Sequence, residues 1–244
     1  MGRGLYALAT GMVSSMQELD VTANALANAN TTGYKNDALA FDNAYNNALN
    51  ARGGCGHSIG TLGVGAVLKD QFVVFKAGSV QETGNSLDVA ILSDRGLFAV
   101  QTPAGVRYTR SGAFRLDQQG KLTTQTGQPI LNNQQQPITI PAGSKVEINS
   151  KGAININGNP ATQLGVFDGT PKKLEGNLYQ LTNPKPFANA ELKQGAIELS
   201  TVNPIDQSLS MIKVHRNMEI AQKAAKQHDE MMKNLIQTLQ KGSS

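Results

Sequence analysis

The residues most suggestive of chemistry lie in a glycine-rich segment around residue 58. Residues 56–60 read GHSIG and match G-x-S-x-G, a strand-to-helix turn that exposes the nucleophilic Ser of many hydrolases. His215 and His228 follow in a chain order that suits a catalytic base. The surroundings do not fit, because an Asn-rich stretch at 46–52 precedes the motif and more glycines follow it. We therefore interpret the segment as a loop and expect Ser58 to have no catalytic role.

Other ligand-binding motifs are incomplete. Gly63-Val64-Gly65 lacks the third glycine of a dinucleotide-binding turn. Leu122 follows Gly120-Lys121, where a phosphate-binding loop places a hydroxyl for magnesium. Zinc at Cys55 and His57 would need two further ligands, which the scattered histidines do not supply. The sequence predicts no metal ion, no cofactor and no enzyme.

Composition narrows the class of protein further. Charged residues make up 16% of the 244 residues, aromatic residues 5%, and the net charge is +4. No basic stripe with interleaved aromatics is visible, so we expect no binding to nucleic acid. No apolar run approaches the ~18 residues that a membrane-spanning helix requires, so we expect no membrane insertion. The abundance of Gly, Asn, Gln, Ser and Thr is typical of an extracytoplasmic β-rich or assembly protein.

The N-terminus could be mistaken for a secretory signal. Arg3 precedes an apolar stretch at 5–13, and Ala25-Leu26-Ala27 mimics a cleavage site. However, Glu18 and Asp20 lie between the apolar stretch and this site, so we expect no cleaved leader. The single cysteine, Cys55, allows no disulfide within the chain.

A heptad pattern occupies the first thirty residues. Apolar or hydroxyl residues recur in steps of three and four at Leu5, Leu8, Met12, Ser15, Leu19, Thr22 and Leu26. This spacing predicts a helix that presents one narrow stripe to a partner helix. The stripe contains two hydroxyl residues, so we expect it to order only when another helix covers it. The Asn, Thr and Gly residues at 28–33 predict the end of the helix.

The C-terminal region carries the matching pattern. Asn203 can cap a helix, Pro204 suits its first position, and Asp206 adds a favourable charge to its first turn. His228 on this stripe is interpreted as a packed or register-setting residue rather than a ligand. The predicted helix runs to about Gln240, and its stripe consists of Met211, Val214, Met218, Ala221, Ala225, His228, Met232, Leu235 and Leu239.

The region between the helices reads as β-structure. Residues 36–51 predict an irregular or marginally helical connector, and 52–65 a Gly-rich loop. From residue 66, short apolar runs separated by tight turns predict strands at 71–75, 87–92, 97–102, 106–110, 113–117, 121–125, 138–140, 145–149, 153–157, 163–167 and 196–200. The expected fold class is α+β, with an antiparallel all-β domain (66–202) inserted between terminal helices (1–35 and 203–244). Those helices should pair as a coiled-coil-like assembly domain.

Residues 20–35 resemble the signature D-x-x-A-N-N-L-A-N-x-x-T-x-G-[FY]-K of bacterial flagellar rod and hook subunits. Ala25 departs from its second Asn, and Asp94-Arg95-Gly96 departs from a usual Gly-x-Gly. Further motifs of that family match in order, including one similar to Y-T-R-x-G-x-F. The residues that carry the resemblance are Asn24, Leu26, Ala27, Asn28, Gly33, Tyr34, Asp88, Tyr108, Thr109, Arg110, Gly112 and Phe114.

The resemblance implies a structural subunit of the flagellar basal-body rod, which polymerises through its terminal helices into a tubular drive shaft. It implies location in the periplasmic rod, and it implies other rod subunits, copies of the same chain and the flagellar export apparatus as partners. The implied assembly contacts are the apolar members of the two heptad stripes. The chain length favours a proximal-rod subunit, with a distal-rod subunit as the alternative. Outside the family, a β-domain hydrolase or binding protein dimerised by its helices remains open.

Overall fold

The computed structural model describes residues 2–43, 46–50, 58–63, 66–174 and 176–241. A long helix opens the chain, a series of short strands follows, and a longer helix ends it. The helices are α1 (Gly2–Ala27) and α2 (Pro204–Lys241). The predicted α+β fold class is confirmed: the terminal helices pack together, and the region between them in the sequence is antiparallel β-structure.

The chain forms two compact units. The first, which we call the helical unit, contains residues 1–26, 38–71 and 204–244. The second, the β unit, contains residues 27–37 and 72–203. Each unit is thus assembled from segments that are far apart in the sequence.

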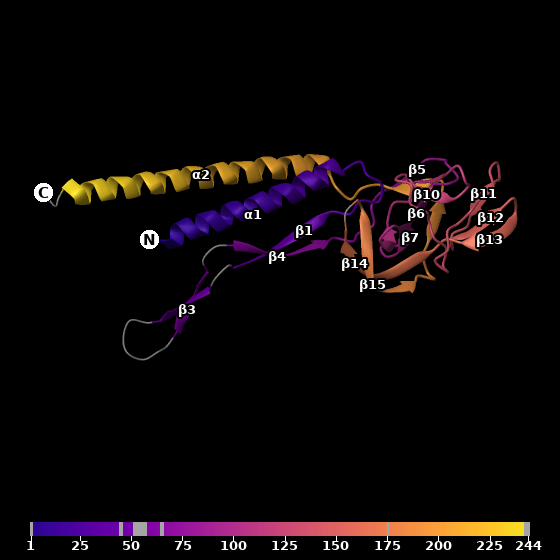
Figure 1. Ribbon diagram of the computed structural model, residues 1–244, viewed down its shortest axis with the longest axis horizontal. Helices are drawn as coiled ribbons and strands as arrows, with labels where there is room; N and C mark the ends of the chain where they lie inside the picture. Colours follow the sequence, from indigo (N-terminus) through magenta and orange to yellow (C-terminus); the bar gives the residue numbers. More distant parts are fainter. Residues whose placement is uncertain (1, 44–45, 51–57, 64–65, 175, 242–244) are drawn as a thin grey trace. The chain divides into compact units, whose positions relative to one another are not determined.

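In the helical unit, α1 and α2 run antiparallel and side by side, with both chain termini at the same end (Figure 1). Pro204 is the first residue of α2 and Asp206 lies in its first turn, as the sequence predicted. After α1, Gly33 adopts a positive φ of 67°, a conformation that a side chain disfavours. Local sequence signals therefore set where α1 ends and where α2 begins.

A long hairpin completes the helical unit and corrects one expectation. Residues 36–65 were expected to be an irregular connector and a loop, but their described part forms strands. β1 (Asp37–Asn43) pairs with β4 (Ala66–Val73), and β2 (Asn46–Asn50) pairs antiparallel with β3 (Ser58–Gly63). Asn-rich segments have low β propensity, but backbone pairing with a partner strand overrides that preference here.

The β unit is built from short strands. They are β5 (Val80–Glu82), β6 (Val89–Ile91), β7 (Leu97–Thr102), β8 (Gly105–Thr109), β9 (Phe114–Leu116), β10 (Leu122–Thr124), β11 (Val146–Ile148), β12 (Ala153–Ile156), β13 (Asn159–Gln163), β14 (Val166–Lys173), β15 (Leu178–Pro186), β16 (Leu192–Gln194) and β17 (Ala196–Glu198).

All the pairings whose register is known in this unit are antiparallel. β14, β15, β8 and β7 close into a small barrel, and β11, β12 and β13 form a three-stranded sheet. The unit also contains three strand pairs, β9–β10, β6–β16 and β5–β17. The turn between β12 and β13 has positive φ at Asn157 and Gly158, as expected for the predicted Asn-Gly hairpin.

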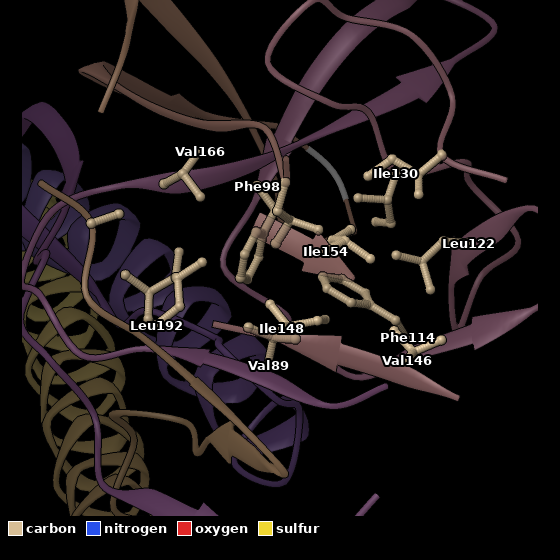
Figure 2. Close-up of a cluster of buried hydrophobic side chains, with 14 of the residues drawn as sticks. Val89, Phe98, Phe114, Leu122, Ile130, Val146, Ile148, Ile154, Val166 and Leu192 are labelled. Atoms are coloured by element: carbon tan, nitrogen blue, oxygen red, sulfur yellow. The ribbon is translucent and has the colours of Figure 1, made fainter. Parts of the chain in front are cut away.

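One large apolar cluster forms the core of the β unit (Figure 2). The Phe98 and Phe114 rings meet edge to face, with their centroids 5.1 Å apart. A second cluster fills the barrel region around Tyr108, Phe167 and Tyr179. Burial of this many large side chains stabilises the β unit independently of any partner.

Candidate functional site

The predicted stripe of α2 is its less exposed side. Val214 is 3% exposed, and the residues of the stripe from Met211 to Met232 are otherwise half-buried. Leu235 near the end of the helix is 49% exposed, and the side chain of Leu239 lies outside the described residues. The burial pattern follows the predicted three–four spacing. Contact of these residues with neighbouring subunits stays a prediction.

The predicted stripe of α1 is covered in the same way. Leu8, Met12, Leu19 and Leu26 are half-buried and Thr22 is buried, while the side chain of Leu5 lies outside the described residues. The covered side is wider than the stripe, because Ser14 and Ala25, each one residue before a stripe position, are also buried.

Hydroxyl groups explain how a polar stripe is tolerated in α1. The Thr22 hydroxyl donates to the Glu18 carbonyl one turn earlier, at 2.7 Å. The Ser14 hydroxyl donates to the Ala66 carbonyl at the start of β4, at 3.0 Å. α1 therefore uses one side to contact the hairpin, and its two buried hydroxyl groups, those of Ser14 and Thr22, are both hydrogen-bonded.

A buried cluster of charges in the β unit brings together residues from three distant places in the chain. Arg110 is 1% exposed, and its Nε donates to Oε2 of Glu198 at 2.5 Å. Its remaining N–H groups donate to four backbone carbonyls of one turn, those of Ile91, Ser93, Arg95 and Gly96. This arginine is thus an internal brace rather than a surface contact.

Lys35 supplies the second cation of the cluster. Its Nζ donates to Oε1 of Glu198 at 2.6 Å and to the carbonyl of Lys76 at 2.5 Å. The same Oε1 accepts the backbone N–H of Gly78 at 2.6 Å. Burial lowers the pKa of Lys35 below its ordinary value of 10.5, although the Glu198 carboxylate opposes that shift. One carboxylate therefore holds two buried cations.

Gly33 lets the chain approach this cluster closely. A Cβ at Gly33 would lie 2.5 Å from the carbonyl carbon of Arg110. The backbone N–H of Gly33 donates to the Glu198 carbonyl at 2.8 Å. Nearby, the N–H of Thr201 donates to the Tyr34 carbonyl at 3.1 Å. The segment that follows α1 and the segment that precedes α2 are therefore bonded to each other inside the β unit.

A second ion pair supports the same segment. Lys173 Nζ lies 2.8 Å from Oδ2 of Asp37 and 4.0 Å from the centroid of the Tyr34 ring. The side-chain amide of Asn177 donates to the Thr32 carbonyl at 3.1 Å. Lys173 at the end of β14 and Asn177 just before β15 thus supply groups that fix residues 32–37.

The other residues of the family resemblance serve the β core. Asp88 accepts hydrogen bonds from the Thr83 hydroxyl at 2.6 Å and the Asn85 amide at 3.1 Å. A Cβ at Gly112 would lie 1.7 Å from the Val89 carbonyl oxygen, so only glycine fits there. Tyr108, Thr109 and Phe114 are buried, Asn28 and Leu26 are half-buried, and Asn24 and Ala27 are exposed.

Sequence reasoning missed Glu198, the centre of the cluster. The available signal was a pair of cations next to predicted elements: Lys35 follows Tyr34, and Arg110 ends the predicted strand 106–110. Two buried cations require a carboxylate, because an unpaired buried charge is strongly destabilising. The sequence did not indicate which acidic residue fulfils that requirement.

The hydrolase motif lies at the edge of the described residues. Gly56 and His57 fall outside them, and Ser58 is the first residue of β3. β3 leads into a further strand, whereas the nucleophile turn of hydrolases leads into a helix. Among the described residues, no group of three His, Cys, Asp or Glu side chains is placed to hold a metal ion. In the same part of the chain, no helix is long and apolar enough to cross a membrane.

Three family profiles match successive parts of the chain. Residues 5–35 match "Flagella basal body rod protein", 91–156 match "Flagellar hook protein FlgE/F/G D1 domain", and 193–238 match "Flagellar basal body rod FlgEFG protein C-terminal". The three ranges include Lys35, Arg110 and Glu198, so each contributes one member of the buried cluster.

Full-length relatives agree with these matches. The chain is 32% identical to the flagellar basal-body rod protein FlgG of Buchnera aphidicola subsp. Schizaphis graminum, over 96% of this chain and 98% of the relative. It is 29% identical to FlgG of Bacillus subtilis, over 97% and 98% of the two chains. It is also 29% identical to FlgF of Caulobacter vibrioides, over 99% of each chain.

Proposed function

The chain belongs to the FlgE/F/G family of flagellar basal-body rod proteins, and on that premise we propose that it is a proximal-rod subunit that polymerises through α1 and α2. Membership makes it a structural subunit of the flagellar basal-body rod, which assembles with other rod subunits, and not an enzyme. The position in the rod and the contacts that build the polymer are the parts that we propose.

The observation that carries the proposed mode of assembly is the surface of the two helices. Tyr6, Val13 and Met16 of α1 are each at least 50% exposed, and so are Leu209, Ile212 and Ile220 of α2. Exposed large apolar side chains in this number mark a contact surface rather than a solvent face. Inside the β unit, the segment that follows α1 (residues 33–36) is hydrogen-bonded to the segment that precedes α2 (residues 198–201).

The chain length supports the proximal position. Its alignments with FlgF relatives extend over 248 or 249 positions, against 258 to 263 positions with FlgG relatives. A chain of 244 residues therefore needs fewer insertions to match FlgF than to match FlgG. The distal rod is the second candidate, and the 32% identity to one FlgG favours it.

We also propose that the subunit passes through the flagellar export apparatus partly unfolded and orders its helices at the growing tip. Two features support this route. The single cysteine permits no intramolecular disulfide that would hinder unfolding. Among the described side chains of α1 and α2, only two apolar residues, Ala25 and Val214, are fully buried, so the helices gain little by ordering before neighbours arrive.

Rods isolated at a defined stage of assembly test the position. In cells in which rod assembly is arrested before the distal segment is added, basal bodies should retain this chain if it forms the proximal rod and lack it if it forms the distal rod. Immunoblots of purified basal bodies give the answer, with a basal-body ring protein as the loading control. Absence of the chain from complete basal bodies of motile cells would exclude both candidates.

A further inference from the structure

The chain passes between the helical unit and the β unit at 26/27, 37/38, 71/72 and 203/204. Three segments of the β unit therefore continue directly into the helical unit along the chain. They are residues 27–37, the segment that begins at residue 72, and the segment that ends at residue 203. A force on either helix is passed along the chain to the β unit through these segments.

The first and the last of these segments lie against each other and run in the same direction. The N–H of Gly33 donates to the Glu198 carbonyl at 2.8 Å, and the N–H of Thr201 donates to the Tyr34 carbonyl at 3.1 Å. The N–H of Asn36 donates to the Thr201 hydroxyl at 3.1 Å. The partners thus advance toward the C-terminus in both segments, so the pairing is parallel.

The segment that begins at residue 72 is bonded to both of the others. The N–H of Val74 donates to the Asn36 carbonyl at 2.9 Å, and the N–H of Leu199 donates to the Ser79 carbonyl at 2.8 Å. A Cβ at Gly78 would lie 2.5 Å from the Leu199 carbonyl oxygen, so glycine permits this close approach. All the segments that connect the β unit to the helical unit therefore meet at one place in the β unit.

One carboxylate holds the three segments together. Glu198 lies on the last segment, and its Oε1 accepts hydrogen bonds from Lys35 Nζ on the first and from the Gly78 N–H on the other, both at 2.6 Å. Its Oε2 accepts the Nε of Arg110, which is bonded to the turn at 91–96 in the β unit. The side chains of Lys35 and Glu198 are at most 1% exposed, so water does not compete for these bonds.

Force applied between the two helices loads the parallel pairing from opposite ends. α1 pulls on the N-terminal end of residues 33–36, and α2 pulls on the C-terminal end of residues 198–201. Parallel segments that are pulled in this way must slide past each other, so all the bonds between them resist at the same time. Segments pulled from the same end separate one bond at a time, which requires a lower force.

We propose that residues 33–36 and 198–201, held together by Lys35, Glu198 and Arg110, form a mechanical clamp that keeps the β unit folded under force between the helices. The inference goes beyond the proposed function, because it concerns the load that the subunit withstands and not its position or its contacts. Forced unfolding is governed by the unfolding rate, so a subunit under load gains more from such a clamp than from equilibrium stability alone.

Force spectroscopy on the purified full-length chain tests the clamp. Handles are attached to a cysteine added at each end of the chain, with Cys55→Ser, and the unfolding rate of the β unit is measured at a fixed force. Opening of the clamp is recognised by its length, because the residues between 36 and 198 extend by about 550 Å. Lys35→Met removes one cation and leaves Glu198 paired with Arg110. It should raise the rate about tenfold, the effect of losing a buried hydrogen bond to a charged group.

The matched control is Ile154→Ala, which removes a fully buried side chain from the core of the same unit, outside both clamp segments. Urea unfolding gives the loss of equilibrium stability for each variant. The logarithm of the rate increase under force, divided by that loss, should be larger for Lys35→Met than for Ile154→Ala. An equal or smaller value for Lys35→Met would show that the cluster stabilises the unit without acting as a clamp.

A second direction of pulling checks the geometry. Gln118 and Lys151 are exposed residues of two turns of the β unit, and force between Gln118→Cys and Lys151→Cys does not load the clamp segments. In this direction Lys35→Met should change the unfolding rate by no more than about twofold, because the clamp is intact when the unit opens. A tenfold increase in both directions would overturn the proposal. If Lys35→Met does not fold, Thr201→Val, which removes the hydroxyl that accepts the Asn36 N–H, takes its place in both directions.

These measurements require no assembled rod, so the two proposals fail separately. A chain that enters rods but unfolds under force as the control does would disprove the clamp and leave the proposed function unchanged. A chain that is absent from rods would disprove the proposed function, and the force measurements would still decide whether the clamp exists.

Discussion

The β unit and the helical unit bury very different side chains. In the β unit, Phe98, Phe114, Ile130, Ile140 and Tyr179 are at most 2% exposed and belong to continuous clusters. Among the described side chains of α1 and α2, the buried apolar residues are only Ala25 and Val214. The β unit therefore closes its own core, while the helices leave large apolar residues uncovered. This difference indicates which part folds alone and which part depends on neighbours.

The largest expected effect comes from removing the carboxylate at the centre of the buried cluster. Glu198→Ala leaves Lys35 and Arg110 buried without their partner, which should destabilise the β unit by about 3–5 kcal/mol. Urea unfolding followed by tyrosine fluorescence measures this, because Tyr34, Tyr108 and Tyr179 are buried in that unit and the chain has no Trp.

The matched control is an ion pair on the surface of the same unit. Glu82 lies 2.5 Å from Lys193, and its side chain is 74% exposed. Glu82→Gln should leave the unfolding midpoint nearly unchanged, because exposed pairs contribute little. Equal effects of the two substitutions would show that the cluster is not what braces the β unit.

Val214→Asp tests the role of the helices. We expect it to reduce assembly into rods and to leave the stability of the β unit unchanged. Val214 is the most buried large side chain among those that the structure describes in α2, and its burial contributes about 1.5–3 kcal/mol that a carboxylate would forfeit. Incorporation into rods should be lost while the tyrosine-monitored unfolding of the β unit stays unchanged. Gln222→Asp, at an exposed position of the same helix, is the control and should still assemble. Loss of the β unit in the Val214 variant would mean that the units do not fold separately.

Replacing a glycine by alanine should destabilise the β unit at one position and stabilise the helical unit at another. Gly112→Ala forces a Cβ against the Val89 carbonyl and should cost the β unit about 1–3 kcal/mol or more. Gly11→Ala adds a methyl group to α1 where no atom lies within 4 Å, and should favour the helix by about 1 kcal/mol. Thermal unfolding monitored by tyrosine fluorescence and by far-ultraviolet circular dichroism distinguishes the two. A stabilising Gly112→Ala would contradict the packing described here.

The smallest effect is a pH dependence within the β unit. Burial raises the pKa of the Tyr179 hydroxyl above its ordinary value of 10. A raised folded-state pKa contributes stability that is present below pH 10 and is lost as the pH rises further, because the unfolded chain ionises first. Tyr179→Phe should therefore flatten the loss of stability above pH 10. At neutral pH it should cost only about 1 kcal/mol, from the lost hydrogen bond to Asn177. Urea unfolding measured at pH 8 and at pH 11 compares the two proteins.

Periodicity predicted the parts of the fold whose apolar residues repeat. The heptads located both helices, and the run at 97–102 coincides with β7. The long strand β15 was missed, because only Leu178, Tyr179 and Leu181 in it are large and apolar and it ends in Asn-Pro-Lys-Pro. The run at 138–140 was expected to be a strand, but the structure pairs it only through isolated bridges such as Lys121–Thr139. Strands held by backbone pairing alone leave little trace in side-chain patterns.

The functional surfaces were predictable to different degrees. A heptad is a local pattern, so the covered stripes could be read from the sequence before any contact was known. The exposed apolar residues of the helices, such as Val13 and Ile212, were not recognised as a surface, because small and charged residues lie between them along the chain. The buried cluster depends on three residues that no local pattern connects.

The spacing of that cluster along the chain has a kinetic consequence. Glu198 pairs with Arg110, 88 residues earlier, and with Lys35, 163 residues earlier. Contacts of such high sequence separation form slowly, because the loop between them must close before any stabilisation is gained. Whichever end of the chain emerges first, the cluster cannot close until almost the whole β unit is present. For a subunit exported in the way proposed above, this delay would keep partly delivered chains from locking into the native state.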